Sequence, residues 1–153
     1  MPSEIETFIE RACQWAMAQL GSTAYPFLCL AFVEDAYERS NDIELDGYAD
    51  AKEAADAYGA QEHQGAAPKG TFVMYNCWGT LQGRYRNWGH VGLSLGDGSV
   101  IHAWNKVRID DTLAVEALTP AEGWTQPRYI GWAPLSEILK GMKTRRWATE
   151  VNS

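Results

Sequence analysis

Three side chains of this sequence could together perform nucleophilic catalysis: Cys29, His90 and His102. Cys29 follows Pro26 near the start of a predicted helix, where unpaired backbone N–H groups and the helix dipole favour an anion. We therefore expect the pKa of its thiol to lie below the usual value of about 8.5. An adjacent imidazole can take up the thiol proton and activate the sulfur. Each residue alone also fits a structural role, so the hypothesis depends on the three occurring together.

The spacing of the two histidines determines whether they can cooperate. They lie in two predicted strands joined by the turn Gly96-Asp97-Gly98. A two-residue loop would point the rings to opposite faces of the hairpin, whereas a three-residue loop would place them on one face, roughly 7–8 Å apart at their Cβ atoms. Gly92 lies between them and leaves the rings room to meet. Because Gly98 can supply the left-handed residue of a three-residue loop, we predict that both rings share one face.

The elements that would position these residues change type along the chain. Apolar residues recur with helical spacing in the first 60 residues and alternate with a period of two after residue 70. Helices followed by strands predict an α+β domain with an antiparallel sheet. The predicted helices cover residues 3–21, 29–42, 46–59 and 134–139, with Ser3 and Asp46 as caps, and the predicted strands cover 72–75, 90–95, 99–104, 107–109 and 129–132. Residues 75–88 are predicted to form an aromatic-rich loop.

Composition excludes several classes of protein. The chain has 153 residues, which we interpret as one domain over residues 1–153, and a formal net charge of −7, which disfavours a nucleic-acid partner. It contains no apolar run of the roughly 20 residues that a membrane span needs. Cys13, Cys29 and Cys77 form an odd set without a CxxC motif, which fits neither a disulfide framework nor a zinc site.

The first residues are acidic and lack the basic end and apolar stretch of a signal peptide. The expected location is therefore the cytoplasm by default, unless the protein is a trimmed, phage-delivered or otherwise secreted enzyme. The sequence does not predict an oligomeric state.

The sequence resembles the NlpC/P60 cysteine peptidases, bacterial cell-wall enzymes, over about residues 8–133. The second histidine follows the first by 12 residues, as in that family. The matching segments are Leu20-Gly21 with Tyr25, Cys29 to Val33 with Tyr37, Pro68-Lys69-Gly70, His90-Val91-Gly92, Leu95-Gly96-Asp97-Gly98 and Ile101-His102-Ala103.

The resemblance implies a papain-like fold, with N-terminal helices packed on an antiparallel half-barrel. It implies Cys29 as the nucleophile, whose own N–H helps to stabilise the oxyanion, His90 as the general base and His102 as the residue that orients it. The implied reaction is amide hydrolysis through a thioester, on peptidoglycan stem peptides next to D-glutamate. No metal or cofactor is implied. Asn105 is an alternative third member of the triad.

Two features leave the substrate and the reaction open. Leu28 and Leu30-Ala31 stand where the family has Asp and Ser-Gly, which help to hold the amine end of the peptide. An acyltransferase or transamidase, and a peptide-binding module without turnover, are therefore alternatives to the hydrolase. The aromatic residues proposed to line the binding groove are Tyr25, Trp78, Trp88 and Trp104.

Overall fold

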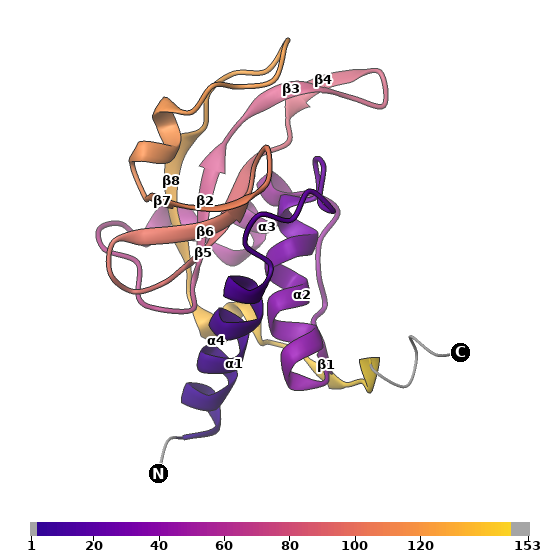
Figure 1. The fold of residues 1–153 in the computed structure, drawn as a ribbon, viewed down its shortest axis with the longest axis vertical. Helices are drawn as coiled ribbons and strands as arrows, with labels where there is room; N and C mark the ends of the chain where they lie inside the picture. Colours follow the sequence, from indigo (N-terminus) through magenta and orange to yellow (C-terminus); the bar gives the residue numbers. More distant parts are fainter. Residues whose placement is uncertain (1–2, 148–153) are drawn as a thin grey trace.

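The computed structural model describes residues 3–147, and the chain runs from helices into strands (Figure 1). The outermost residues of the predicted domain 1–153 lie outside this range. The helices are α1 (Glu4–Ala18), α2 (Cys29–Asn41), α3 (Ala51–Tyr58) and α4 (Leu135–Ile138), with short 3-10 helices η1 (Ala60–Glu62) and η2 (Ala114–Ala117). The strands are β1 (Ile43–Glu44), β2 (Phe72–Asn76), β3 (Trp78–Leu81), β4 (Arg84–Asn87), β5 (His90–Ser94), β6 (Ser99–Ala103), β7 (Val107–Asp111), β8 (Arg128–Ala133) and β9 (Lys143–Thr144).

The helix starts follow local capping chemistry. Ser3 caps α1 as predicted, because its hydroxyl accepts the N–H of Glu6 at 3.1 Å. The predicted cap of α3 at Asp46 is wrong: Asp50 caps this helix and accepts the N–H of Glu53 at 2.9 Å. An N-cap must directly precede the first helical residue, and Gly47, with φ +70°, keeps the segment after Asp46 out of a helix.

Five antiparallel strands form the main sheet in the order β7-β6-β5-β2-β8. Between β5 and β6, Leu93 lies opposite Ile101, and the N–H of Leu95 bonds to the carbonyl of Ser99 at 3.0 Å. This register is the three-residue loop predicted from the sequence. It places His90, at the start of β5, on the same face of the sheet as His102 in β6.

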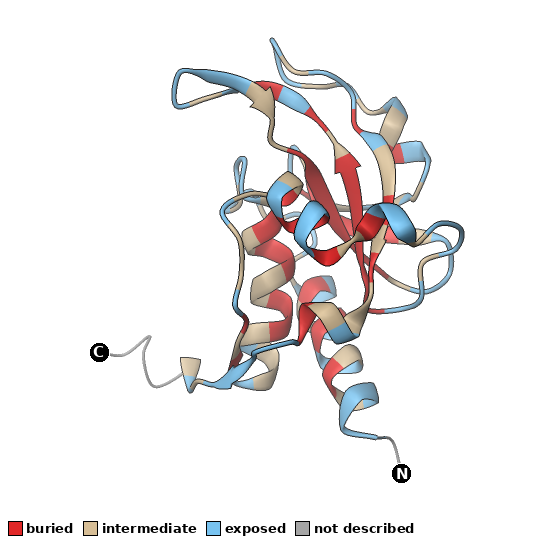
Figure 2. Cartoon of the chain, turned by 180° about the vertical axis from the view of Figure 1, so that it is seen from behind, coloured by how far each residue is buried: buried red, intermediate tan, exposed pale blue. Residues whose placement is uncertain are grey.

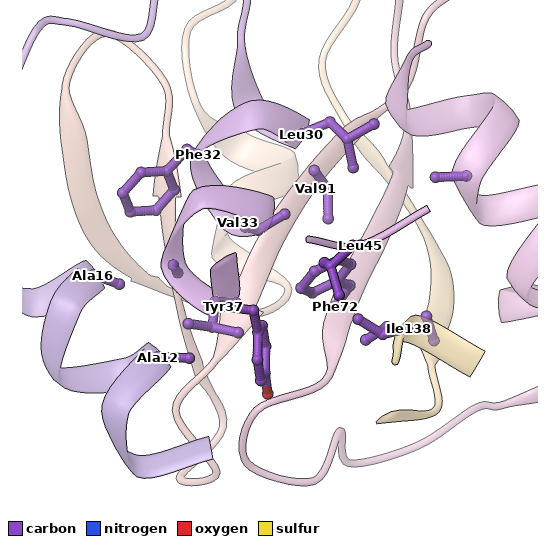
Figure 3. Packing of buried hydrophobic residues seen from close by; sticks show 14 of the residues in the cluster. Ala12, Ala16, Leu30, Phe32, Val33, Tyr37, Leu45, Phe72, Val91 and Ile138 are labelled. Atoms are coloured by element: carbon purple, nitrogen blue, oxygen red, sulfur yellow. The ribbon is translucent and has the colours of Figure 1, made fainter. Parts of the chain in front are cut away.

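The core lies between one face of this sheet and the helices. Helix α1 lies beside α2, and α2 and α3 pack on the sheet (Figure 1). Figure 3 shows Val33 and Tyr37 of α2 directed toward Val91 and Phe72 of the sheet. Figure 2 shows the central strands as buried, whereas the turns and outer loops are exposed. The predicted α+β, papain-like arrangement of N-terminal helices on an antiparallel sheet is confirmed.

The predicted loop at residues 75–88 is instead a hairpin of β3 and β4. Gln82 and Gly83 form its turn, and both have positive φ, at 54° and 76°. Such a two-residue turn matches the twist of a hairpin, but glutamine is not a usual residue in it, so residue type alone does not predict this turn. The hairpin extends beyond the sheet, at the same end of the molecule as the segment that leads into β8 (Figure 1).

The C-terminal part returns to the helices. Strand β9 pairs with β1, where Thr144 lies opposite Ile43 directly after helix α2. Among the helices of residues 3–147, none is long and apolar enough to cross a bilayer.

Candidate active site

Cys29 and His90 line one cavity of about 640 Å³. Its walls come from the start of α2, the segment before α3, the tip of the β3–β4 hairpin, and the segments 103–106 and 119–124. Phe27 and Trp124 stack at its rim, with ring centroids 5.4 Å apart. The fold therefore brings the predicted nucleophile and base, 61 residues apart in the sequence, to the same enclosed space.

Cys29 is the first residue of α2. Leu28 occupies the N-cap position and provides no side-chain hydrogen bond to the first turn. The backbone amides of Val91, Leu30 and Cys29 all act on the sulfur and lower its pKa. These amides create the type of site that stabilises negative charge, either on sulfur or on a reacting oxygen beside it.

The prediction of a low thiol pKa is wrong for this conformation. Burial raises the pKa of the Cys29 thiol to about 11, and the three amides only partly oppose this effect. Removal of the sulfur from water penalises the thiolate more than the helix start favours it. The thiol is therefore protonated at neutral pH.

His90 is the first residue of β5 and is only 4% exposed. Its Nε2 atom lies 2.8 Å from Nδ1 of His102, and the Trp104 ring packs edge-on against it with centroids 5.1 Å apart. Burial and the neighbouring His102 hold the pKa of His90 well below its usual value. The imidazole is therefore neutral at pH 7, which is the form that can accept a proton.

His102 is fully buried and joins His90 to an acidic residue that the sequence analysis did not identify. Its Nε2 atom lies 2.8 Å from Oδ2 of Asp110. Arg108 lies opposite His102 in the sheet and donates to both oxygens of Asp110, from Nε at 2.8 Å and Nη2 at 3.1 Å. The sequence contained one indication of this acid: Arg108 and Asp110 are two residues apart, and so lie on one face of the strand that follows His102.

The hydrogen bonds assign the ring protons in this chain. Burial raises the pKa of Asp110, but hydrogen bonds from His102 and Arg108 outweigh it and keep the carboxyl ionised. His102 must then donate from Nε2 to Asp110, which leaves its Nδ1 as an acceptor. His90 consequently donates from Nε2 and has its lone pair on Nδ1. The chain of three residues thus leaves Nδ1 of His90 as the unprotonated nitrogen, which can accept a proton.

No hydrogen bond joins the Cys29 thiol to His90 among the described residues, where the bonds of His90 run to His102. Catalytic hydrogen bonds are often long in a ligand-free site and shorten when substrate binds. The two groups share a cavity wall, so the described state is a resting pair of neutral thiol and neutral imidazole.

Three of the four predicted aromatic residues lie in the cavity wall, and the polar group of each side chain makes a hydrogen bond. Tyr25 donates its hydroxyl to Asp35 at 2.8 Å, and Trp88 and Trp104 donate their indole N–H groups to backbone carbonyls. Trp78 is different, because it is 44% exposed and its ring packs on Tyr85. Within residues 3–147, it does not belong to the set that lines the cavity. Strand alternation explains this, because Trp78 projects from the opposite face of β3 to Leu81, which lines the cavity.

Asn105, the alternative third member of the triad, also lies in the cavity wall. Its side-chain oxygen accepts from Arg108 at 3.3 Å, whereas His102 is the residue bonded to His90. Within residues 3–147, no group of three or more His, Cys, Asp or Glu residues is arranged to hold a metal ion.

A search of curated proteins finds no match to the chain. The family model of the NlpC/P60 family matches residues 17–126, which is more than half of the 153 residues and includes Cys29, His90 and His102. The chain therefore belongs to the NlpC/P60 family, a membership that supports a cysteine peptidase or amidohydrolase at the level of the family.

Proposed function

We propose that this protein hydrolyses amide bonds in peptidoglycan stem peptides, with Cys29 as nucleophile, His90 as general base and His102 as the residue that orients His90. The observation that carries the proposal is the hydrogen-bonded chain from Asp110 through His102 to His90, which leaves Nδ1 of His90 without a proton on a residue that lines the same cavity as Cys29. Family membership supports cell-wall peptidase activity in general terms.

In the first step, the Cys29 sulfur attacks the carbonyl carbon of the amide while its proton moves to Nδ1 of His90. The resulting imidazolium is stabilised through His102 by the Asp110 carboxylate. The N–H of Cys29, at the start of a helix without a side-chain cap, would stabilise the oxyanion. His90 then gives the proton to the leaving nitrogen, the C–N bond breaks, and a thioester remains on Cys29.

In the second step, His90 takes a proton from water, which attacks the thioester carbonyl. The C–S bond breaks, the sulfur regains its proton, and a carboxylic acid leaves. If an amine replaces water as the acceptor, the same site performs acyl transfer. An apolar wall beside Cys29, formed in part by Leu28 and Leu30, is the observation that keeps acyl transfer as the second candidate reaction.

A digest of purified muropeptides tests the proposal, with products read by mass spectrometry. Wild type should produce fragments that add the mass of water across one amide bond, and Cys29→Ser should produce none. Cys13→Ala, which removes a buried sulfur outside the cavity wall, is the matched control and should retain activity. A parallel digest with added methylamine identifies a transferase, whose product carries the amine. Equal products from wild type and Cys29→Ser would exclude Cys29 as the nucleophile.

A further inference from the structure

The turn that leads into α2 holds an aromatic residue in a backbone conformation that usually requires glycine. The N–H of Leu28 donates to the carbonyl of Tyr25 at 3.2 Å and closes this turn. Pro26 at the second position and a positive φ at the third are typical of a type II turn, in which the third residue is usually glycine. Here the third residue is Phe27, with φ +57°. A side chain as bulky as phenylalanine rarely adopts this conformation, so the turn is strained.

The ring of Phe27 is directed to the cavity and not into the core. Phe27 is 60% exposed, and its ring stacks on Trp124 with centroids 5.4 Å apart and an interplanar angle of 28°. Both residues line the cavity that Cys29 also lines. A strained backbone that presents an exposed apolar ring beside a nucleophile is typical of a binding position and not of a packing one.

Trp124 is attached to the opposite side of the cavity. The neighbouring Thr125 is bound to β3 by two hydrogen bonds: its N–H donates to the carbonyl of Trp78 at 2.8 Å, and its Oγ1 accepts the N–H of Trp78 at 2.9 Å. The ring itself lies against Gly79, where a Cβ would be only 1.9 Å from Cδ2. The two stacked rings therefore connect two segments that lie far apart in the sequence, one before α2 and one beside β3.

The part of the wall around these rings is uncharged. The lining residues of segments 25–31 and 119–124 carry no formal charge, and they include Leu28, which is 49% exposed. The charged residues of the described wall lie in other segments: Asp50, which pairs with Arg86 at 3.5 Å, Lys106, and Glu34, whose pKa burial raises to about 7. A polar ligand group placed against the rings would lose water without gaining a partner, whereas an apolar group is stabilised by burial.

We propose that Phe27 and Trp124 form a subsite for a large apolar group of the ligand that Cys29 attacks, with Phe27 as the specificity-determining residue. Phe27 precedes Cys29 by two residues, so their Cα atoms are at most roughly 7 Å apart. The subsite therefore selects amides that carry an aromatic or branched aliphatic group within roughly two residues of the attacked carbonyl. Turnover of such an amide rests on the proposed function, whereas selection of an apolar group beside the Cys29 thiol does not.

Alkylation of Cys29 by two reagents tests the proposal. N-(2-phenylethyl)iodoacetamide carries an aromatic group, and N-(2,3-dihydroxypropyl)iodoacetamide carries a polar group in the same place. Peptide mapping by mass spectrometry gives the rate at Cys29 at pH 8, and each rate is divided by that of the same reagent with glutathione to remove intrinsic reactivity. Wild type should prefer the phenylethyl reagent by about tenfold or more, and Phe27→Gly should lose most of this preference.

Two further measurements separate binding from folding. Glycine adopts a positive φ without strain, so Phe27→Gly removes the ring and should unfold in urea at a midpoint equal to or above that of wild type. Tyr85→Ala is the matched control, because Tyr85 is a 62% exposed aromatic residue outside the described cavity wall, and this variant should keep the preference. Neither reagent has to be hydrolysed, so a preference without digestion of muropeptides would contradict the proposed function and leave the subsite intact.

Three outcomes would overturn the proposal. Equal corrected rates for the two reagents in wild type would show that the cavity does not select an apolar group. A preference that persists in Phe27→Gly, or that is lost equally in Tyr85→Ala, would remove Phe27 as its specific cause. A lower unfolding midpoint for Phe27→Gly would show that the ring is retained for the stability of the fold.

Discussion

Nε2 of His90 lies 2.8 Å from Nδ1 of His102, across a stretch of sheet where Gly92 has no side chain. A Cβ on Gly92 would lie only 3.1 Å from Cβ of His102, so a larger residue would push the rings apart. The contact fixes which nitrogen of His90 is basic, because His102 is itself bonded to Asp110. Asp110 thus acts on the candidate nucleophile through two imidazole rings without touching the cavity.

The first prediction concerns Asp110. Asp110→Asn keeps the shape of the side chain but removes the negative charge that stabilises protonated His90 through His102. We expect kcat/KM on muropeptides to fall by roughly 100-fold, since such a relay supports general base catalysis. Asp111→Asn is the control, because Asp111 is exposed and is the next residue of the same strand. An equal fall in kcat/KM in both variants would show that the effect comes from loss of any acidic charge on this strand and not from the contact with His102.

The second prediction concerns the reactivity of Cys29 in the free protein. With a thiol pKa of about 11 and a neutral His90, the rate of alkylation by iodoacetamide should rise about tenfold per pH unit between pH 7 and pH 10. Cys13 and Cys77 are buried and should react more slowly than Cys29. Peptide mapping by mass spectrometry gives the three rates. A rate that is already constant at pH 7 would instead indicate a thiolate paired with an imidazolium.

The third prediction concerns stability. Folded Glu34 holds its proton up to about pH 7, whereas an unfolded glutamate loses it near pH 4.5. The unfolded state therefore binds fewer protons in this range, so the Glu34 term lowers the free energy of unfolding as the pH rises. Glu34→Gln should be more stable than wild type at pH 8, by on the order of 2 kcal/mol, and equally stable below pH 4.5. Urea unfolding at both pH values measures the difference in free energy of unfolding between the two proteins. A difference that does not depend on pH would contradict a raised pKa for Glu34.

The fourth prediction concerns the wall made by Trp124. A Cβ on Gly79 would lie 1.9 Å from Cδ2 of Trp124, so Gly79→Ala must displace this ring. Trp124 stacks on Phe27 at the cavity rim, and its displacement should open the cavity and raise KM several-fold while the core and kcat are retained. Tryptophan fluorescence and steady-state kinetics measure the two effects. Thr80→Ala, at the next and exposed position of β3, should change neither.

The positions of the two histidines could be predicted from the sequence because a hairpin is local. The loop between β5 and β6 contains three residues, and its length alone places His90 and His102 on one face. The capping of α1 by Ser3 is predictable for the same reason, since donor and acceptor lie three residues apart. The family match covers residues 17–126, a range that includes both histidines.

Other features depend on contacts between distant segments. The N-cap of α3 could be identified only from the path of the chain around Gly47. The role of Asp110 could be identified only from the pairing of β6 with β7. The pKa of Cys29 depends on its surroundings in the folded chain: the helix start alone predicts a lower value, but desolvation raises it. The residues that can react are predictable from the sequence, because residue type and local spacing are properties of the sequence. Their protonation and the position of Glu34 depend on the folded structure, because desolvation and charge pairing arise when distant segments pack together.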